Sequence, residues 1–230
     1  MTFIKTTHVG SLPRSADLTK MLLQRDHHEA IPEADFDALV CAEIERGVRA
    51  QVDAGVSVVS DGEFGKVGYS TYITARLSGF GGHVDRVPAK DLADLPELRT
   101  KLAAIMGTQG FVRASCIGKV RLVDSKPVQD DIRRFAAAMA KEGKSARGFL
   151  NAASPGLITA FQPNQFYPTH EAYLADLVDA MRPEYEAIVA AGFDLQLDAP
   201  DLAMAAHTGF QHLSEKEFLT RAAQNVEALN

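Results

Sequence analysis

Two acidic residues stand directly after a short apolar segment in the first third of the chain. Residues 56–60 are rich in valine, which is typical of a strand buried on both faces. Gly62 breaks this segment, and Asp61 and Glu63 follow its end. Because ligands of parallel α/β sheets bind at the carboxyl ends of the strands, this position indicates a binding or catalytic site.

The same pattern, a predicted strand followed by acidic residues, recurs near residue 198. A helical pattern ends at Gly192, residues 193–197 predict another strand, and Asp198 and Asp201 follow it. A single acid in a loop is more often a turn former or a solvated group than a functional one. Acids at two strand ends favour a functional interpretation of Glu63 and Asp198, because loops on this face converge on one site.

Further polar side chains fall at the ends of the other predicted strands. Each has a structural alternative, such as a turn residue for Ser11, an interior histidine for His8 and a buried thiol for Cys116. No histidine has the spacing of a metal ligand, and no G-x-G-x-x-G, P-loop, nucleophile elbow or HExxH motif occurs. The candidates are His8, Ser11, Cys116, Lys119, Asn151 and Ser154.

The elements that must position these residues alternate between strand and helix. A capping box at Ser214–Glu217 opens the last of the predicted helices, and residues 65–110 form an excursion between the second and third strands. The predicted strands are 3–9, 56–60, 111–117, 147–151 and 193–197, and the predicted helices are 35–54, 95–106, 129–141, 169–191 and 214–229.

Five βα units without a linker predict one α/β domain over residues 1–230, built on a parallel sheet with right-handed crossovers. Periodicity alone leaves two architectures open. One is an open, doubly wound sheet of five strands. The other is a (β/α)8 TIM-type barrel of which this chain holds the first five βα units, since a whole barrel takes about 250 residues.

Composition limits the classes of partner. The chain has 230 residues, 46% of them hydrophobic and 23% charged, and a formal net charge of -6. Its lysines and arginines are scattered, which argues against nucleic acid or an anionic membrane surface as the main partner. With no membrane-spanning apolar run, no signal peptide and two cysteines outside any disulfide framework, the sequence predicts a cytoplasmic protein.

Five motifs in order along the chain carry a family resemblance. They resemble the catalytic barrel of the cobalamin-independent methionine synthase family, and the resemblance spans nearly the whole chain. The motifs are Thr6-Thr7-His8-Val9-Gly10-Ser11-Leu12-Pro13, Ser60-Asp61-Gly62-Glu63, Ser154-Pro155-Gly156, Pro163-Asn164 and Leu197-Asp198-Ala199-Pro200.

The resemblance implies a (β/α)8 barrel that holds zinc and activates a thiol, with methyl transfer from a folate donor to homocysteine. Zinc would lower the pKa of the thiol, so that a thiolate nucleophile exists at neutral pH. By position, Ser11, Glu63 and Asp198 match residues that hold the amino-acid part of homocysteine. An α-ammonium group binds carboxylates, and a carboxylate binds hydroxyl and N–H donors.

The chain departs from the family pattern at the metal. The family's zinc ligands lie on the sixth to eighth strands, whereas this sequence ends in the helix after the fifth and its thiols are Cys41 and Cys116. It also has Ala199 where the family has a glutamate. We therefore expect no zinc ligands in this chain and little or no transferase activity, and the thiol acceptor is open.

Two other interpretations stay open. One is a metal-free relative on the same barrel, similar to uroporphyrinogen decarboxylase, which would bind an acidic tetrapyrrole through arginines such as Arg14 and Arg113. The other is a non-enzymatic partial barrel that binds an amino-acid ligand, or that pairs with a second copy to cover its open edge.

Overall fold

The computed structural model describes all residues of the chain except 1–3, 28, 83, 85–88, 106–113 and 144. Contacts between Cα atoms divide the chain into two compact units. The first unit comprises Met1–Tyr72, Asp124–Ala152 and Pro183–Leu197, and the second comprises Ile73–Val123, Ala153–Arg182 and Asp198–Asn230.

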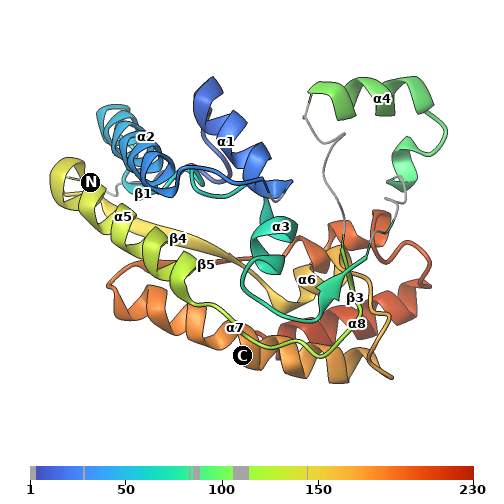
Figure 1. Ribbon diagram of the computed structural model, residues 1–230. Helices are drawn as coiled ribbons and strands as arrows, with labels where there is room; N and C mark the ends of the chain where they lie inside the picture. The colour runs from blue at the N-terminus through green and yellow to red at the C-terminus, as the bar shows by residue number, and fades with distance from the viewer. Residues whose placement is uncertain (1–3, 28, 83, 85–88, 106–113, 144) are drawn as a thin grey trace. The chain divides into compact units, whose positions relative to one another are not determined.

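Helices and strands follow one another along the chain as Figure 1 shows. None of the helices in the described ranges is long and apolar enough to cross a membrane. The helices are α1 (Ala16–Asp26), α2 (Glu33–Asp53), α3 (Tyr69–Thr74), α4 (Pro96–Ile105), α5 (Lys126–Glu142), α6 (Pro155–Phe161), α7 (His170–Ala190) and α8 (Glu215–Glu227). The strands are β1 (Val58–Ser60), β2 (Phe80–Gly81), β3 (Ser115–Cys116), β4 (Arg147–Ala153) and β5 (Asp194–Asp198), and short 3-10 helices cover Lys90–Leu92, Pro200–Leu202 and Met204–His207.

The first unit is built on the sheet β1-β4-β5. β1 and β4 run parallel, with Val58 opposite Arg147 and Ser60 opposite Phe149. On the other side of β1, Thr7 forms a single parallel bridge to Val58. An α/β fold with a parallel sheet, as predicted, is therefore confirmed.

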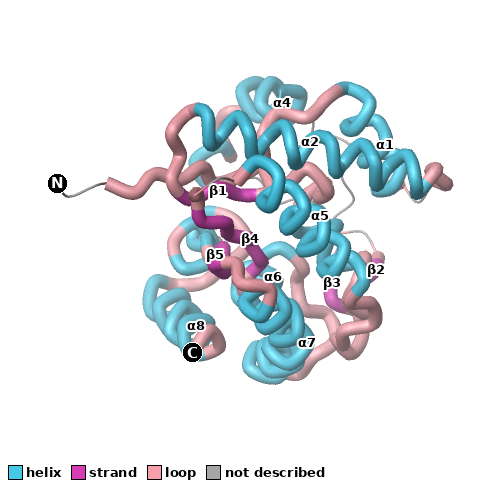
Figure 2. The backbone as a smooth tube through the Cα atoms, turned by 90° about the vertical axis from the view of Figure 1, so that its left-hand side faces the viewer, coloured by secondary structure: helices cyan, strands magenta, loops and turns pink. Residues whose placement is uncertain are grey.

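Helices α2 and α5 pack against each other beside this sheet (Figure 2). Apolar residues recur every three to four positions along both helices, so each helix buries one face and exposes the opposite one. The phenyl rings of Phe135 and Phe193 lie 4.7 Å apart between their centroids. The core of the unit comprises Leu18, Leu22, Phe36, Val40, Ile44, Val48, Val59, Phe64, Phe135, Ala138, Leu150, Ala152 and Ile188.

The second unit holds the antiparallel pair β2-β3, α6, α8 and most of α7. The predicted capping box is present, because the Ser214 side chain accepts from the Glu217 N–H and the Glu217 carboxylate accepts from the Ser214 N–H. A small core forms where Ala160, Ala205 and Phe210 meet. This unit contains the candidate residues Cys116, Lys119, Ser154, Asp198 and Asp201.

Two predicted strands differ from expectation. Among its described residues, the strand predicted over 3–9 is reduced to the single bridge of Thr7 to Val58. The strand predicted over 111–117 is reduced to β3, which pairs antiparallel with β2 and not with the parallel sheet, while residues 111–113 lie outside the described part. Its other edge is occupied, since the Cys116 N–H donates to the carbonyl of Pro163 and the Cys116 carbonyl accepts from Gln165. β1 consequently pairs directly with β4, and the predicted run of five consecutive barrel strands is not confirmed.

Candidate functional site

The end of β1 is fixed by a glutamine from α2. The buried side chain of Gln51 accepts from the Ser60 N–H at 3.0 Å and donates to the Ser60 carbonyl at 2.9 Å. A buried strand end needs partners for its backbone groups, and here one amide side chain supplies both. The residues that follow Ser60 therefore leave the sheet from a fixed point.

The turn after β1 is left-handed at two residues in a row. Gly62 has φ +66° and Glu63 has φ +56°, an uncommon conformation for a residue with a Cβ atom. A Cβ atom at position 62 would lie 2.7 Å from the Phe64 ring and 2.9 Å from Leu12, so this position requires glycine. The Asp61 carboxylate supports the turn by accepting from the Glu63 N–H at 2.9 Å.

This turn brings the Glu63 carboxylate to two side chains distant in sequence. The Ser11 hydroxyl donates to Glu63 Oε2 at 2.7 Å, and Asn151 Nδ2, from β4, donates to Glu63 Oε1 at 2.5 Å. Glu63 is half-buried and Ser11 is exposed. Two of the three residues predicted to bind substrate, together with the strand-end candidate Asn151, therefore lie together.

Arg14 ties the same group together from the other side. Its Nη2 atom donates to Ser11 Oγ at 3.2 Å and to the carbonyl oxygens of Glu63 and Lys66 at 2.8 and 2.7 Å. Its Nε atom is buried without a hydrogen-bond partner among the described residues. Burial lowers the pKa of Arg14, although the nearby carboxylates of Glu63 and Asp61 oppose that shift.

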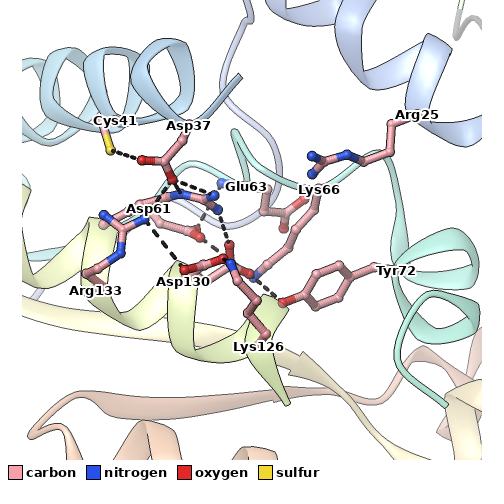
Figure 3. Close-up of polar contacts among 12 residues, drawn as sticks. Arg25, Asp37, Cys41, Asp61, Glu63, Lys66, Tyr72, Lys126, Asp130 and Arg133 are labelled. Carbon is pink, nitrogen blue, oxygen red and sulfur yellow. Dashed lines mark hydrogen bonds and ion pairs between the residues drawn. The ribbon is translucent and has the colours of Figure 1, made fainter. Parts of the chain in front are cut away.

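A buried lysine, Lys66, extends between Asp61 and Tyr72 (Figure 3). Lys66 Nζ lies 3.3 Å from Asn151 Oδ1 and 3.6 Å from Asp61 Oδ2, and the residue is 6% exposed. Burial acts to lower the pKa of Lys66, but the carboxylates of Asp61, Asp131 and Glu63 outweigh it and the pKa is raised. Lys66 is therefore a cation, and at neutral pH it has no lone pair for nucleophilic chemistry.

A second buried carboxylate borders this lysine. Asp131 of α5 accepts from the Tyr72 hydroxyl at 2.5 Å and pairs with Arg134 at 3.3 Å. Burial raises the pKa of Asp131, and the charge of Lys66 opposes the shift. Toward the surface, Asp37 of α2 accepts from both Arg133 and Arg134, so that ion pairs join α2 to α5 (Figure 3).

The acids at the end of β5 lie in the second unit. Asp198 is half-buried, and its carbonyl accepts from the Ser154 N–H at 3.0 Å. Asp201 is buried and accepts from the Ser154 hydroxyl at 3.0 Å and from Asn225 Nδ2 at 2.8 Å. Burial raises the pKa of Asp201, with these two donors opposing the shift. Asp201 thus joins α6 to α8, and a role of Asp198 in substrate binding stays a prediction.

Metal-ligating side chains do not cluster within the part of the chain that the structure describes, where no three His, Cys, Asp or Glu residues could hold a metal ion together. The described residues therefore do not fit the zinc that the family resemblance implies. Cys116 is buried, and burial raises the pKa of its thiol, which favours the structural role. His8 Nε2 is buried without a partner among the described residues.

Neither of the two cations, Arg14 and Lys66, belongs to the candidate residues predicted from the sequence. Lys66 stands between Phe64 and Val67, and a lysine in an apolar run is a signal for a buried, paired charge. Arg14 was considered only as a contact for a tetrapyrrole, whereas its guanidinium is directed at the backbone of the Glu63 turn. Asn225 and His170, which complete the cluster around Asp201, gave no signal because their partners are distant in sequence.

Comparison with known proteins finds a family match for part of the chain. Residues 3–88 match the family model described as "Cobalamin-independent synthase, Catalytic domain". This segment contains Ser11 and Glu63, the pair joined at 2.7 Å. Over these residues the chain is similar to the cobalamin-independent methionine synthases. The resemblance predicted from the sequence motifs is therefore confirmed.

Similar proteins extend beyond that segment. A 5-methyltetrahydropteroyltriglutamate--homocysteine methyltransferase from Thermosynechococcus vestitus is 32% identical over 153 residues, covering 59% of this chain and 20% of that protein. A methionine synthase from Sulfolobus acidocaldarius is 26% identical over 215 residues, covering 90% of this chain and 54% of that protein. The chain thus spans between a fifth and about half of the length of these relatives.

A solved structure supports the fold. The structure of a B12-independent methionine synthase from Shewanella sp. W3-18-1, in complex with selenomethionine, has a TM-score of 0.61 and 17% sequence identity. The match covers 96% of this chain and 58% of that chain. At this identity the likeness concerns the fold alone.

Proposed function

We propose that this chain binds the amino-acid portion of a small thiol, of the homocysteine type, and that it contributes this half-site to S-methylation. The observation that carries the proposal is the Glu63 carboxylate, held at 2.7 Å by the Ser11 hydroxyl although the two residues are 52 positions apart. The names of the relatives, which include homocysteine methyltransferases and methionine synthases, support the substrate class.

The chemistry of the group fits an amino acid. A carboxylate offers about four lone-pair sites, and Glu63 uses one on each oxygen for Ser11 and Asn151, so it can still accept from an α-ammonium group. The Arg14 guanidinium, with Nη2 3.2 Å from Oγ of the exposed Ser11, adds positive charge beside this group, which favours a ligand α-carboxylate. Asp198 is proposed as a further substrate contact from the resemblance.

The reaction proposed for the whole enzyme is transfer of a methyl group. A bond forms between the thiolate sulfur and the methyl carbon, while the bond to the donor nitrogen of a methyltetrahydropteroylglutamate breaks. Its electron pair stays on that nitrogen, which takes up a proton from solvent. The first five units of a (β/α)8 barrel are the proposed scaffold. Zinc is proposed only by resemblance, since the described residues do not fit a zinc site, and no step is assigned to it.

The experiment is a titration of the purified chain with L-homocysteine and L-methionine in a calorimeter. We expect binding by the wild type and a loss of about tenfold or more in Glu63→Gln, because a hydrogen bond to a charged group contributes about 1.5–3 kcal/mol. Glu33→Gln, an exposed glutamate at the start of α2, is the matched control. Equal affinity in wild type and Glu63→Gln would overturn the proposal.

The remaining parts of the proposal need separate tests. Asp198→Asn should weaken the same titration if Asp198 contacts the substrate. A methyl-transfer assay with added zinc tests the prediction that this chain alone has little transferase activity. A homo-oligomer and a cytoplasmic location also stay predictions, and sedimentation of the purified chain tests the former.

The decarboxylase-like alternative gains no support. Of the two arginines that it invoked, Arg113 lies outside the described residues. Arg14 donates to Ser11 and to two backbone carbonyl groups, an arrangement that stabilises the Glu63 turn. We therefore retain the thiol-binding proposal.

A further inference from the structure

Glu63 is held by two side chains whose hydrogen atoms could point in more than one direction. A serine hydroxyl rotates, and an asparagine amide can be flipped by 180° so that its oxygen and nitrogen exchange places. Both must present a hydrogen to Glu63, because an ionised carboxylate accepts and cannot donate. The Glu63 carboxylate favours that orientation, and a group on the far side of each donor can hold it there.

In each case the adjacent group is a cation. Arg14 Nη2 donates to Ser11 Oγ at 3.2 Å, so the hydroxyl oxygen accepts there and its own hydrogen is left for Glu63 Oε2. Lys66 Nζ lies 3.3 Å from Asn151 Oδ1, and an ammonium group has no acceptor, so the amide oxygen must face it. The amide nitrogen then faces Glu63 Oε1.

We infer that Arg14 and Lys66 are positioning residues that act on Glu63 through Ser11 and Asn151, and that they make Glu63 selective for a protonated amine. The two chains of hydrogen bonds run from opposite sides, Arg14 to Ser11 to Glu63 and Lys66 to Asn151 to Glu63. Neither cation needs to touch the ligand.

Both cations are anchored by contacts of their own. Arg14 also donates to the carbonyl oxygens of Glu63 and Lys66, which fixes the left-handed turn against the guanidinium. Lys66 is buried beside Asp61 and over the ring of Tyr72, with Nζ 5.5 Å from the ring centroid. Since neither cation is free to leave, the orientation of both donors is set before a ligand arrives.

This arrangement defines the class of group that Glu63 can bind. Its carboxylate is presented with acceptor sites only, so a ligand must bring a hydrogen-bond donor and preferably a positive charge. A free α-ammonium group meets both conditions, whereas an N-acylated amino acid keeps one weak donor and loses the charge. The ligand-affinity test of this inference rests on the proposed function. The orientation of Ser11 and Asn151 by the two cations does not.

The first measurement needs no ligand. The chain contains four asparagines, so selective ¹⁵N labelling resolves their side-chain amides, and Asn151→Ala identifies the signal of residue 151. We expect hydrogen exchange of the Asn151 side-chain amide to accelerate by about tenfold in Lys66→Met, because the hydrogen bond from the Lys66 ammonium to Asn151 Oδ1 is lost. Arg134→Met is the matched control, because it removes another buried cation, which pairs with Asp131 and not with Asn151.

The second measurement compares L-methionine with N-acetyl-L-methionine. In the wild type we expect L-methionine to bind more tightly, and in Lys66→Met and Arg14→Met the ratio of the two dissociation constants should fall by about tenfold. Arg134→Met should keep the wild-type ratio. A structural role alone would weaken both ligands together and leave the ratio unchanged.

The outcomes separate the two proposals. If the wild type binds neither compound, the proposed function fails, while the exchange of the Asn151 amide still decides the positioning role. Unchanged exchange in folded Lys66→Met, or an unchanged ratio, overturns the inference. If Lys66→Met does not fold, two other variants decide. Lys66→Arg keeps a buried cation and must retain the wild-type ratio of dissociation constants. Asn151→Asp places an acceptor against Glu63 and must lose that ratio.

Discussion

Two carboxylate clusters of this protein differ in what surrounds them. In the first unit, Glu63 accepts from Ser11 and Asn151, and each of these donors is oriented by a cation. In the second unit, Asp201 accepts from Ser154 and Asn225, which are neutral. The two acids thus have the same kinds of donor, a hydroxyl and an amide, and differ in the charges behind them.

On our proposal, the difference separates a group that binds a ligand from a structural link. Burial raises the pKa of Asp201 because its neutral donors offset only part of the lost hydration, and the Asp201 side chain joins α6 to α8. Around Glu63, the buried carboxylates instead raise the pKa of Lys66, so charge of both signs persists inside the first unit. Buried charge with partners is costly to assemble, which makes it a better indicator of a ligand site than a buried acid alone.

The largest expected effect comes from removing the central cation. Lys66→Met removes the ion-pair partner of Asp61 and one of the two cations, with Arg134, whose charge acts on Asp131, and breaking a buried ion pair costs about 3–5 kcal/mol. We expect the free energy of unfolding in urea to fall by that amount at pH 7. Lys126→Met, which breaks the exposed pair with Asp130 on α5, should cost less than about 1 kcal/mol. Equal losses would show that the charges around Lys66 are hydrated.

The second effect tests how tightly the Asp201 cluster is packed. A Cβ atom at Gly156 would lie 2.1 Å from Asp201 Oδ2 and 2.6 Å from Asn225 Nδ2. Gly156→Ala should therefore destabilise the protein by about 3 kcal/mol, the upper range for overpacking a buried site. Gly68→Ala, where an added Cβ meets nothing within 4 Å, is the control and should change stability little. A tolerated Gly156→Ala would mean that the cluster can rearrange.

The elements that could be predicted from the sequence are those with local signals. The helical period over 35–54 predicted α2 within two residues at its start, and the capping residues Ser214 and Glu217 located the start of α8. α1 was missed although Ser15 caps it, and α6 was missed because seven residues carry too little periodicity. The partner of β3 could not be predicted, because a choice between β2 and the parallel sheet depends on distant chain segments.

The candidate site also has residues that the sequence predicts and residues that depend on distant segments of the chain. Ser11 and Glu63 were predicted because each stands in a recognisable motif at a strand end, and the structure brings them together. The actions of Arg14 and Lys66 could not be predicted, since both depend on which backbone carbonyl or amide oxygen lies within reach after folding. Motifs thus indicated the group that we propose to meet a ligand, whereas the groups proposed to orient it follow only from the three-dimensional arrangement.

A third effect concerns the helix that carries Asn225. Ser214 begins α8 and accepts from the Glu217 N–H, and replacing such a cap by alanine costs about 1 kcal/mol. Ser214→Ala should lower the free energy of unfolding by that amount, and Ser214→Asp should restore most of it. Protection of the α8 amides from hydrogen exchange should fall in Ser214→Ala, while the amides of α2, in the first unit, should keep theirs. Equal loss in α2 and α8 would argue that the two clusters are energetically coupled.

The smallest effect is a pH dependence of the neutral cluster. His170 Nε2 lies 2.9 Å from Asn225 Oδ1, and burial lowers the pKa of His170, with Asn225 opposing the shift. A lowered histidine pKa means that the unfolded chain binds the proton more readily than the folded one. The stability that neutral His170 contributes is therefore present above about pH 6.5 and is lost as the pH falls through the pKa of the folded state. Because the ring is only partly buried, we expect a loss of less than about 1 kcal/mol between pH 7 and pH 5.

His170→Gln measures this contribution directly. A glutamine can still donate to Asn225 Oδ1 but does not titrate, so its stability should vary less with pH over this window than that of the wild type. His212→Gln, at an exposed position of the same unit, controls for the loss of a histidine. If His170→Gln retains the full wild-type slope, the histidine does not sense the Asp201 cluster. A reduced slope would show that this neutral cluster, unlike the charged one around Glu63, loses stability when a proton adds a charge to it.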